Sequence, residues 1–378
     1  MKILYVITKA DRGGAQVHLL DLLSSLPPGY QPVIATGEKG FLTEQAGKLG
    51  MRVRLIRDLV QPIAPLKDLR ALRSLMKVIK QEEPDLIHVH TSKAALLGRL
   101  GALLTGRPSV FTAHTWSFSD GIPWIQKCIS LPLEQLAAFA CKKIINVSQA
   151  NVAMARRKAI GTGDRLVCIW NGIPDVPVRA RPGTGDVTTL LMTARFVPQK
   201  NHLSFIEAMA GVTGDWRVIL VGDGPTRKPV EEAVERLGVT ERVVFAGERK
   251  DVAELLAESD IFVLSSNWEG LPLSILEAMR AALPVVATAV GGVAEAVDDG
   301  VTGFLVPPQS PETLRDRLQT LVSSRPLQQQ MGVSGRLRYD RDFRIEAMVR
   351  KTLAVYNEVL LQPQIRLGEA VVKRQEPS

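Results

Sequence analysis

Short apolar runs alternate with amphipathic stretches along almost the whole chain. In the first half the apolar runs lie at residues 3–8, 33–36, 53–56, 86–90, 110–113, 144–148 and 167–170. In the second half they lie at residues 189–193, 217–221, 243–247, 261–265, 285–288 and 303–306. Apolar strands separated by helical patterns indicate parallel sheets that are covered on both faces. The pattern therefore predicts an α/β fold.

A segment rich in proline and glycine separates the two series of strands. Residues 174–185 contain three prolines and two glycines, which is typical of a linker. We therefore predict two doubly wound, Rossmann-like domains, at residues 1–173 and 186–343, that face each other across a cleft. The pattern of residues 344–361 predicts a last amphipathic helix, and residues 362–378 a loose polar tail. Ligands of such sheets bind beyond the carboxyl ends of the strands, so we expect functional residues there.

Composition narrows the class of protein. Of the 378 residues 46% are hydrophobic and 23% charged, which excludes a disordered or collagen-like chain. The net charge is +8, and the first 175 residues hold the whole excess, with 23 Lys and Arg against 13 Asp and Glu. This basic half favours an anionic partner, such as a lipid headgroup or a phosphorylated substrate, although a solvated surface would also explain it. We expect no nucleic-acid partner, because no basic–aromatic motif accompanies the charge.

Several features bear on location. The three cysteines are too scattered for a disulfide framework, which indicates a reducing compartment. The apolar N-terminus is too short for a signal peptide, and no uncharged stretch is long enough to span a bilayer, so we expect a cytoplasmic protein. Residues 116–143 combine ten large apolar side chains with three lysines. Our hypothesis is that this segment binds an anionic membrane surface peripherally; an ordinary core is the alternative.

Glycines and cations follow three of the predicted strands. Gly13 and Gly14 lie between the first strand and a helix, where a backbone without Cβ atoms lets a diphosphate approach; a tight turn explains them equally well. Arg195 and Lys200 flank the loop that follows the predicted strand at residues 189–193. Their spacing lets both cations bind one diphosphate; the alternative is that they are ordinary surface cations. Gly222 opens a Gly-Asp-Gly-Pro turn that we expect to shape the same site.

Two glutamates mark the most informative segment. Glu269 lies in a loop after an apolar strand, and Glu277 lies eight residues further on, in a helix. A carboxylate accepts paired hydrogen bonds from vicinal hydroxyls, which sugars and ribose present. For Glu277 the alternative is an exposed helix position, although its neighbours are apolar.

Histidines mark the ends of two predicted strands. His114 follows a strand, where we expect a binding-site side chain; a structural, hydrogen-bonded histidine is the alternative. His88 and His90 share one face of a strand, but no cysteine or carboxylate completes a metal site with them. We therefore predict that no metal ion is bound.

Together these motifs resemble those of the family 4 retaining glycosyltransferases, which have two Rossmann-like domains (the GT-B type). The resemblance rests on EGLPLSILEAM at residues 269–279, the paired glycines, the R-x4-K and G-D-G-P loops and GGVAE at residues 291–295. It extends over nearly the whole chain. The sequences at residues 86–94 and 111–116 are similar to those of enzymes that build bacterial capsule, lipopolysaccharide or exopolysaccharide.

The resemblance implies roles at the reacting end of a nucleotide-sugar donor. Arg195 and Lys200 match the residues that hold the donor diphosphate, and Gly14 matches the glycine beneath it. Glu269 matches the carboxylate on the hydroxyls of the donor sugar. His114 matches a histidine near that sugar.

Other residues match the nucleotide side of the donor site. Glu277 corresponds to the carboxylate on the ribose hydroxyls, and Arg249 lies in the loop that contacts the base. The backbone beside the nucleotide and phosphates corresponds to Leu273, Ser274 and Ile275. The chain departs from the family at Gln16, where many members have a glutamate. The resemblance also implies that the helix at 344–361 returns to the N-terminal domain.

From these observations we predict a retaining glycosyltransferase. It would move a sugar from a nucleotide-diphosphate donor, with a UDP-sugar as the expected donor, to a hydroxyl of a glycan or lipid-linked acceptor. The N-terminal domain would bind the acceptor and the C-terminal domain the donor, without a cofactor or metal. Cell-surface polysaccharide or glycolipid assembly is the expected process. The alternatives are a nucleotide-sugar epimerase or hydrolase on the same fold, and a non-catalytic nucleotide-sugar-binding protein.

Overall fold

The structure, a computed structural model, describes residues 1–119, 121–122, 124–161 and 163–361. Its contacts divide the chain into two units. The first consists of Met1–Asn171 and the segment that begins at Ile345, and the second is Gly172–Arg344. The predicted tail at 362–378 lies outside the described residues.

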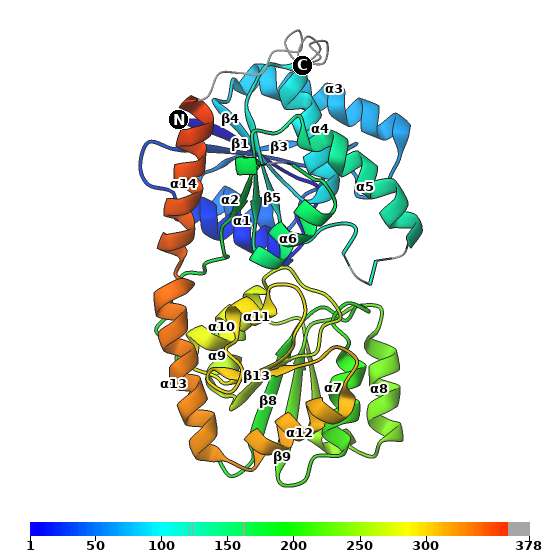
Figure 1. Cartoon of the computed structure of the whole chain (residues 1–378), viewed down its shortest axis with the longest axis vertical. Helices are drawn as coiled ribbons and strands as arrows, with labels where there is room; N and C mark the ends of the chain where they lie inside the picture. Colours follow the sequence, from blue (N-terminus) through cyan, green and yellow to red (C-terminus); the bar gives the residue numbers. More distant parts are fainter. Residues whose placement is uncertain (120, 123, 162, 362–378) are drawn as a thin grey trace, which may run out of the picture. The chain divides into compact units, whose positions relative to one another are not determined.

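The first unit is built on a seven-stranded parallel sheet in the order β3-β2-β1-β4-β5-β6-β7 (Figure 1). The strands are β1 (Lys2–Ile7), β2 (Gln31–Thr36), β3 (Arg52–Leu55), β4 (Leu86–His90), β5 (Ser109–Ala113), β6 (Lys143–Asn146) and β7 (Leu166–Cys168). The helices are α1 (Gly14–Ser24), α2 (Phe41–Lys48), α3 (Pro65–Glu82), α4 (Ser92–Leu104), α5 (Trp124–Ala138), α6 (Gln149–Arg157), the 3₁₀ turn η1 (Gly163–Arg165) and α14 (Ile345–Leu361).

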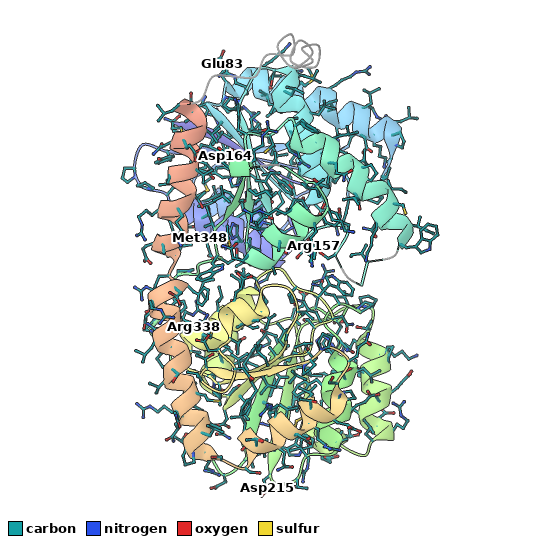
Figure 2. All side chains as sticks on the ribbon, in the orientation of Figure 1. Glu83, Arg157, Asp164, Asp215, Arg338 and Met348 are labelled. Carbon is teal, nitrogen blue, oxygen red and sulfur yellow. The ribbon has the colours of Figure 1, made fainter. Side chains whose placement is uncertain are left out.

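Apolar cores cover both faces of this first sheet. On one face, buried side chains of α1, α2 and α14 pack against alternate residues of β1, such as Ile3 and Tyr5. Met348 of α14, labelled in Figure 2, belongs to this core. On the other face, α3, α4 and α6 pack against Leu4 and Val6. Successive residues of one strand therefore serve opposite cores, which is why the strand is apolar without interruption.

The second unit has a six-stranded parallel sheet in the order β10-β9-β8-β11-β12-β13 (Figure 1). The strands are β8 (Thr188–Thr193), β9 (Trp216–Val221), β10 (Val243–Gly247), β11 (Ile261–Leu264), β12 (Val285–Thr288) and β13 (Gly303–Val306). The helices are α7 (His202–Ala210), α8 (Arg227–Arg236), η2 (Thr240–Arg242), α9 (Val252–Ala257), α10 (Leu273–Arg280), α11 (Val293–Ala296), α12 (Pro311–Val322) and α13 (Arg325–Asp342).

Each sheet has one point at which the strand order reverses. In the first unit the reversal lies between β1 and β4, and in the second between β8 and β11. Loops after these neighbouring strands leave the sheet toward opposite faces and open a crevice between them. We therefore expect ligand-binding residues in the loops after β1, β4, β8 and β11.

The structure confirms the predicted fold class of two parallel, doubly wound sheets, and a strand is present at each predicted apolar run. The sequence pattern also indicates helices at residues 16–26, 67–82, 93–105, 149–159, 202–210, 229–237, 252–258, 273–282 and 311–322, and each has a helix in the structure. Helices α2, α5, α11 and α13 lie outside these ranges. No helix within the described ranges is long and apolar enough to cross a membrane.

The segment predicted as a linker packs along the second unit. Ala180 N donates to Ala281 O at 2.8 Å, and Gly183 N donates to Asp260 Oδ1 at 2.6 Å. Asp175 pairs with Arg336 of α13 at 2.8 Å. The chain passes from the first unit to the second at Asn171–Gly172, before this segment, and returns at Arg344–Ile345.

Candidate functional site

Two loops of the second unit bring Lys200 and Glu269 into contact. Because β8 and β11 are paired neighbours in the sheet, the loops that follow them lie side by side. The Lys200 Nζ donates to Glu269 Oε1 at 2.5 Å, and Ser266 Oγ donates to the same oxygen at 2.7 Å. Asn267 N donates to Gln199 O at 2.7 Å and joins the loops further. Two candidate residues that are far apart in the sequence therefore form one group.

The environment of this pair favours ligand binding at the lysine. Glu269 is buried, with 8% of its surface exposed, whereas the Lys200 side chain is 19% exposed. A buried carboxylate needs a partner of opposite charge, and Lys200 supplies it. An ammonium group has three N–H donors, so the contact with Glu269 uses only one of them. The rest of the group is suited to an anion such as a phosphate.

Arg195 lies on the same loop as Lys200. Between the two cations Phe196 is fully buried and anchors the loop, and its N–H donates at 3.0 Å to a carbonyl of the turn that begins at Gly222. At Gly222 φ is +132°, and a Cβ atom would lie 2.1 Å from the carbonyl oxygen of Ala194. Only glycine fits there. The predicted Gly222 turn therefore supports the loop that carries both cations.

Helix α10 presents the other predicted donor-site residues of the second unit. Leu273 and Ser274 begin the helix and are half-buried, as is Glu277 one turn later, whereas Ile275 is fully buried. Because positions four apart share a helix face, Glu277 lies on the same side as Leu273. The first N–H groups of a helix have no partner inside it and attract anions. The start of α10 and Glu277 are therefore suited to bind adjacent parts of one ligand.

Arg249 lies further from this group. It follows β10, which β9 separates from β8, and it is exposed and paired with Asp251, with Nε 2.8 Å from Oδ1.

In the first unit, Gly14 begins α1 directly after the loop that follows β1. A Cβ atom at Gly14 would meet nothing within 4 Å, and φ is not positive there. A tight turn therefore does not require a glycine at this position. Gln16 is buried, and its Nε2 donates to Lys9 O at 3.1 Å. A glutamate carboxylate has no proton to donate there, so the departure at this position has a structural reason.

Three histidines gather at the reversal point of the first sheet. His90 ends β4, His114 follows β5, and His18 lies on α1. His90 Nδ1 and His114 Nε2 are 3.1 Å apart, and the ring centroids of His18 and His114 are 4.7 Å apart. His18 and His90 are buried, and His114 is half-buried. We call these three residues the histidine cluster.

Burial keeps the histidine cluster neutral. It lowers the pKa of His18 to about 4 and holds the pKa of His90 and His114 well below the ordinary value. For His90 and His114 the neighbouring imidazoles lower the pKa further, because each would repel a second positive charge. At neutral pH these rings therefore have lone pairs for a hydrogen-bond donor or a metal ion.

His88 has a different role from its neighbour His90. Its Nδ1 is 2.5 Å from Tyr356 Oη of α14, and its Nε2 is 2.7 Å from Thr112 Oγ1. Both ring nitrogens are therefore occupied, and burial lowers the pKa of His88 to about 3. His88 is a structural histidine that joins α14 to the sheet.

The sequence analysis missed His18. It lies one turn after Gly14, so the helix that starts at the paired glycines carries it to the end of β1. A signal was available, because a polar residue on the sheet-facing side of α1 is unusual among Leu19, Leu22 and Leu23.

Comparison with known proteins matches both halves of the chain. The model of Glycosyltransferase Family 4 matches residues 12–175, and that of Glycosyl transferases group 1 matches residues 179–338. The chain is 29% identical over 287 residues to the UDP-Gal:alpha-D-GlcNAc-diphosphoundecaprenol alpha-1,3-galactosyltransferase of Escherichia coli, covering 71% of this chain and 74% of that enzyme. It is 26% identical to the N-acetyl-alpha-D-glucosaminyl L-malate synthase of Bacillus anthracis, and the match covers 78% of this chain and 80% of that enzyme.

The fold also matches solved structures. HepE of Anabaena, crystallised in complex with UDP and glucose, superposes with a TM-score of 0.83 at 23% identity, covering 95% of this chain and 100% of that one. At this identity the likeness supports the fold. The two family models, which together span most of the chain, and the described relatives lead to one conclusion: the chain belongs to the group 1, family 4 glycosyltransferases of the GT-B type.

Proposed function

We propose that this glycosyltransferase moves a sugar from a UDP-sugar to the hydroxyl of a lipid-linked glycan, with retention at the anomeric carbon. The contact between Lys200 and Glu269, at the reversal point of the second sheet, carries the proposal. The contact places a cation that can bind a phosphate beside a carboxylate that can bind sugar hydroxyls, in the two neighbouring loops after β8 and β11.

The second unit would hold the donor. Lys200 and Arg195 would bind the diphosphate, the start of α10 would supply N–H groups to it, and Glu277 would bind the ribose. As the bond between sugar and phosphate breaks, negative charge grows on the departing diphosphate. Fixed cations and N–H donors stabilise that charge more than they stabilise the ground state, and this difference accelerates the reaction.

Retention is proposed to proceed by attack on the same face that the diphosphate leaves. Glu269 is held by Lys200 and Ser266, which suits a carboxylate that orients hydroxyls. A donor phosphate oxygen would take the proton of the acceptor hydroxyl. His114 would act as a neutral imidazole that hydrogen-bonds a sugar hydroxyl. With two cations at the diphosphate we propose that transfer needs no metal ion.

The choice of donor and acceptor rests on the relatives. The Escherichia coli enzyme is named for a UDP-galactose donor and a diphosphoundecaprenol acceptor, and HepE was solved with UDP. The basic excess of the first 175 residues is suited to the diphosphate of such an acceptor.

A membrane-facing helix would bring the enzyme to a lipid-linked acceptor. On α5 the exposed side chains include Trp124, Ile125 and Leu136, which are 72%, 59% and 69% exposed. The opposite side of α5 is fixed by a buried ion pair, with Glu134 Oε2 2.6 Å from Arg99 of α4. We therefore propose that α5 rests on the cytoplasmic surface of an anionic membrane.

The direct test measures UDP release and product formation with a panel of UDP-sugars. We expect release to require an acceptor such as undecaprenyl-diphosphate N-acetylglucosamine, to give an α-linked product by NMR and to persist in EDTA. Equal release without acceptor would indicate a hydrolase, and a β-linked product would contradict retention. Binding of UDP-sugar without any turnover would indicate a non-catalytic protein.

A further inference from the structure

The histidine cluster offers nitrogen atoms that nothing in the described part of the protein uses. His18 Nδ1 and His90 Nε2 are buried, and within the described residues neither has a hydrogen-bond partner. A buried polar atom without a partner is destabilising, so a fold rarely keeps two of them in one cluster without a ligand.

The geometry points to one kind of ligand. One ring nitrogen from each of His18, His90 and His114 lies within 4.8 Å of the others. Nitrogen ligands bind Zn²⁺ at about 2.0–2.1 Å, so two of them on one tetrahedral ion lie roughly 3.3 Å apart. The rings therefore need to move by only on the order of 1 Å to bind one ion.

The surroundings of the cluster also resemble those of metal ligands. A ligating histidine usually directs its second nitrogen to another polar group, which fixes the ring. The His18 side chain is hydrogen-bonded to Asn171. His88 serves as a contrast within the same strand, because both of its nitrogens are already hydrogen-bonded.

We propose that His18, His90 and His114 form a site for one divalent transition-metal ion that prefers imidazole ligands, for which Zn²⁺ is the probe. Three neutral imidazoles with a fourth position open to water are a known zinc ligand set. The ion is not part of the transfer reaction. It inhibits transfer because it occupies His114, and this second statement rests on the proposed function.

Zinc binding is measured directly on the full chain, without a histidine tag and with exposed Cys128 changed to serine. Competition with a chromogenic chelator should show one tight equivalent of Zn²⁺ per chain. His18→Asn, His90→Asn and His114→Asn should each weaken it by at least about tenfold, the effect that loss of even an outer-shell partner has. His202→Asn is the matched control: His202 is also buried, but it lies in the second unit, and zinc binding should stay unchanged.

X-ray absorption of the zinc-loaded parent chain gives an answer that needs no histidine variant to fold. Imidazole nitrogens at about 2.0 Å are expected around the ion. Zinc binding that survives all three substitutions, a zinc coordination shell without imidazoles, or the absence of a bound equivalent would overturn the proposal.

In the transfer assay, added Zn²⁺ should inhibit the parent chain, and EDTA should restore its activity. Histidine-dependent binding without inhibition would leave the metal site standing and refute the role of His114.

Discussion

At the scale of single residues, the buried carboxylate of Glu269 organises the donor loops. It accepts hydrogen bonds from Lys200 and Ser266 on one oxygen, while its backbone lies under the Gly291–Gly292 turn, since a Cβ at Gly291 would be 1.9 Å from Glu269 O. The side chain is therefore positioned before any ligand arrives. Such preorganisation is what a group needs if it is to orient a sugar without moving.

Replacement of Glu269 should show whether this positioning matters. Glu269→Gln keeps the shape but removes the charge that faces Lys200. We expect kcat/KM to fall by about 10²–10³-fold, a loss typical of one preorganised polar group. Steady-state kinetics with saturating acceptor would measure it.

The matched control is Glu254→Gln, an exposed carboxylate on α9 of the same unit. It should change kcat/KM by no more than about twofold. Equal rates for Glu269→Gln and the parent enzyme would refute the assigned role.

The histidines also set a pH dependence of stability. In the folded chain the pKa of His18 is lowered to about 4 and that of His88 to about 3 by burial, so below the unfolded value near 6.5 the unfolded chain binds more protons. The stability that these two neutral histidines contribute is fully present above pH 6.5, and it decreases as the pH falls toward 4. Between pH 6.5 and 5 we expect a loss on the order of 1–2 kcal/mol per buried histidine in urea unfolding. A flat profile over this range would contradict the burial of neutral rings.

Candidate site residues in the loops after strands could be identified from the sequence, whereas a candidate site residue on a helix was missed. Lys200, Glu269 and His114 were found because an apolar strand ends just before each loop. His18 was missed because its place at the end of β1 depends on how α1 folds back on the sheet, and no local pattern gives that. The partner of a side chain, such as Lys200 for Glu269, could not be predicted either, since it depends on strand order.

At the scale of elements, α14 is attached to the first sheet by polar as well as apolar contacts. Tyr356 Oη reaches His88, and Lys143 of β6 pairs with Glu358 at 2.6 Å and with Asp164, labelled in Figure 2, at 3.1 Å. The apolar side of the helix fills one core of that sheet. The chain that returns from the second unit therefore completes the first.

Removal of one hydroxyl tests this attachment. Tyr356→Phe leaves His88 Nδ1 buried without its partner, so the first unit should lose about 1–3 kcal/mol of unfolding free energy in a denaturant titration. Tyr30→Phe, at a half-buried tyrosine of the same unit, should change it by less than about 0.5 kcal/mol. Equal stabilities of the two variants would show that the Tyr356–His88 contact contributes nothing.

The apolar face of α5 leads to a second prediction at this scale. The double variant Trp124→Ala, Leu136→Ala should reduce co-sedimentation with anionic vesicles by at least about tenfold, because each side chain contributes about 1.5–3 kcal/mol when fully buried. Val333→Ala with Leu337→Ala removes two apolar side chains of α13 that are also more than half exposed, and this double variant should leave recovery unchanged. Equal recovery of the parent chain with and without anionic lipid would refute the membrane surface.

Two of the helices outside the predicted ranges, α5 and α13, have positions that a hydrophobic pattern does not sort into buried and exposed. Helix α5 has Pro132 inside it and an apolar outer face, so its periodicity does not separate buried from exposed positions. In α13 the buried residues include Gln328, Gly332 and Gly335, which a hydrophobic pattern cannot identify. The strands were predictable because burial on both faces leaves them apolar throughout.

At the scale of the whole chain, the same plan occurs twice. Each unit is a parallel sheet with one reversal point. A group of largely buried polar residues lies at each reversal point: the histidine cluster in the first unit and the Lys200–Glu269 pair in the second. The repeated plan could be predicted from the alternation of strands and helices. The predicted end of the first domain at residue 173 lies two residues from the change of unit at Asn171–Gly172, whereas residues 174–185 have the composition of a linker but pack along the second unit.

The most direct measurement is a crystal structure of the chain grown with UDP. The account predicts a β-phosphate oxygen within about 3 Å of Lys200 Nζ, with the ribose hydroxyls on Glu277. A diphosphate bound elsewhere, with Lys200 still engaged only by Glu269, would contradict it.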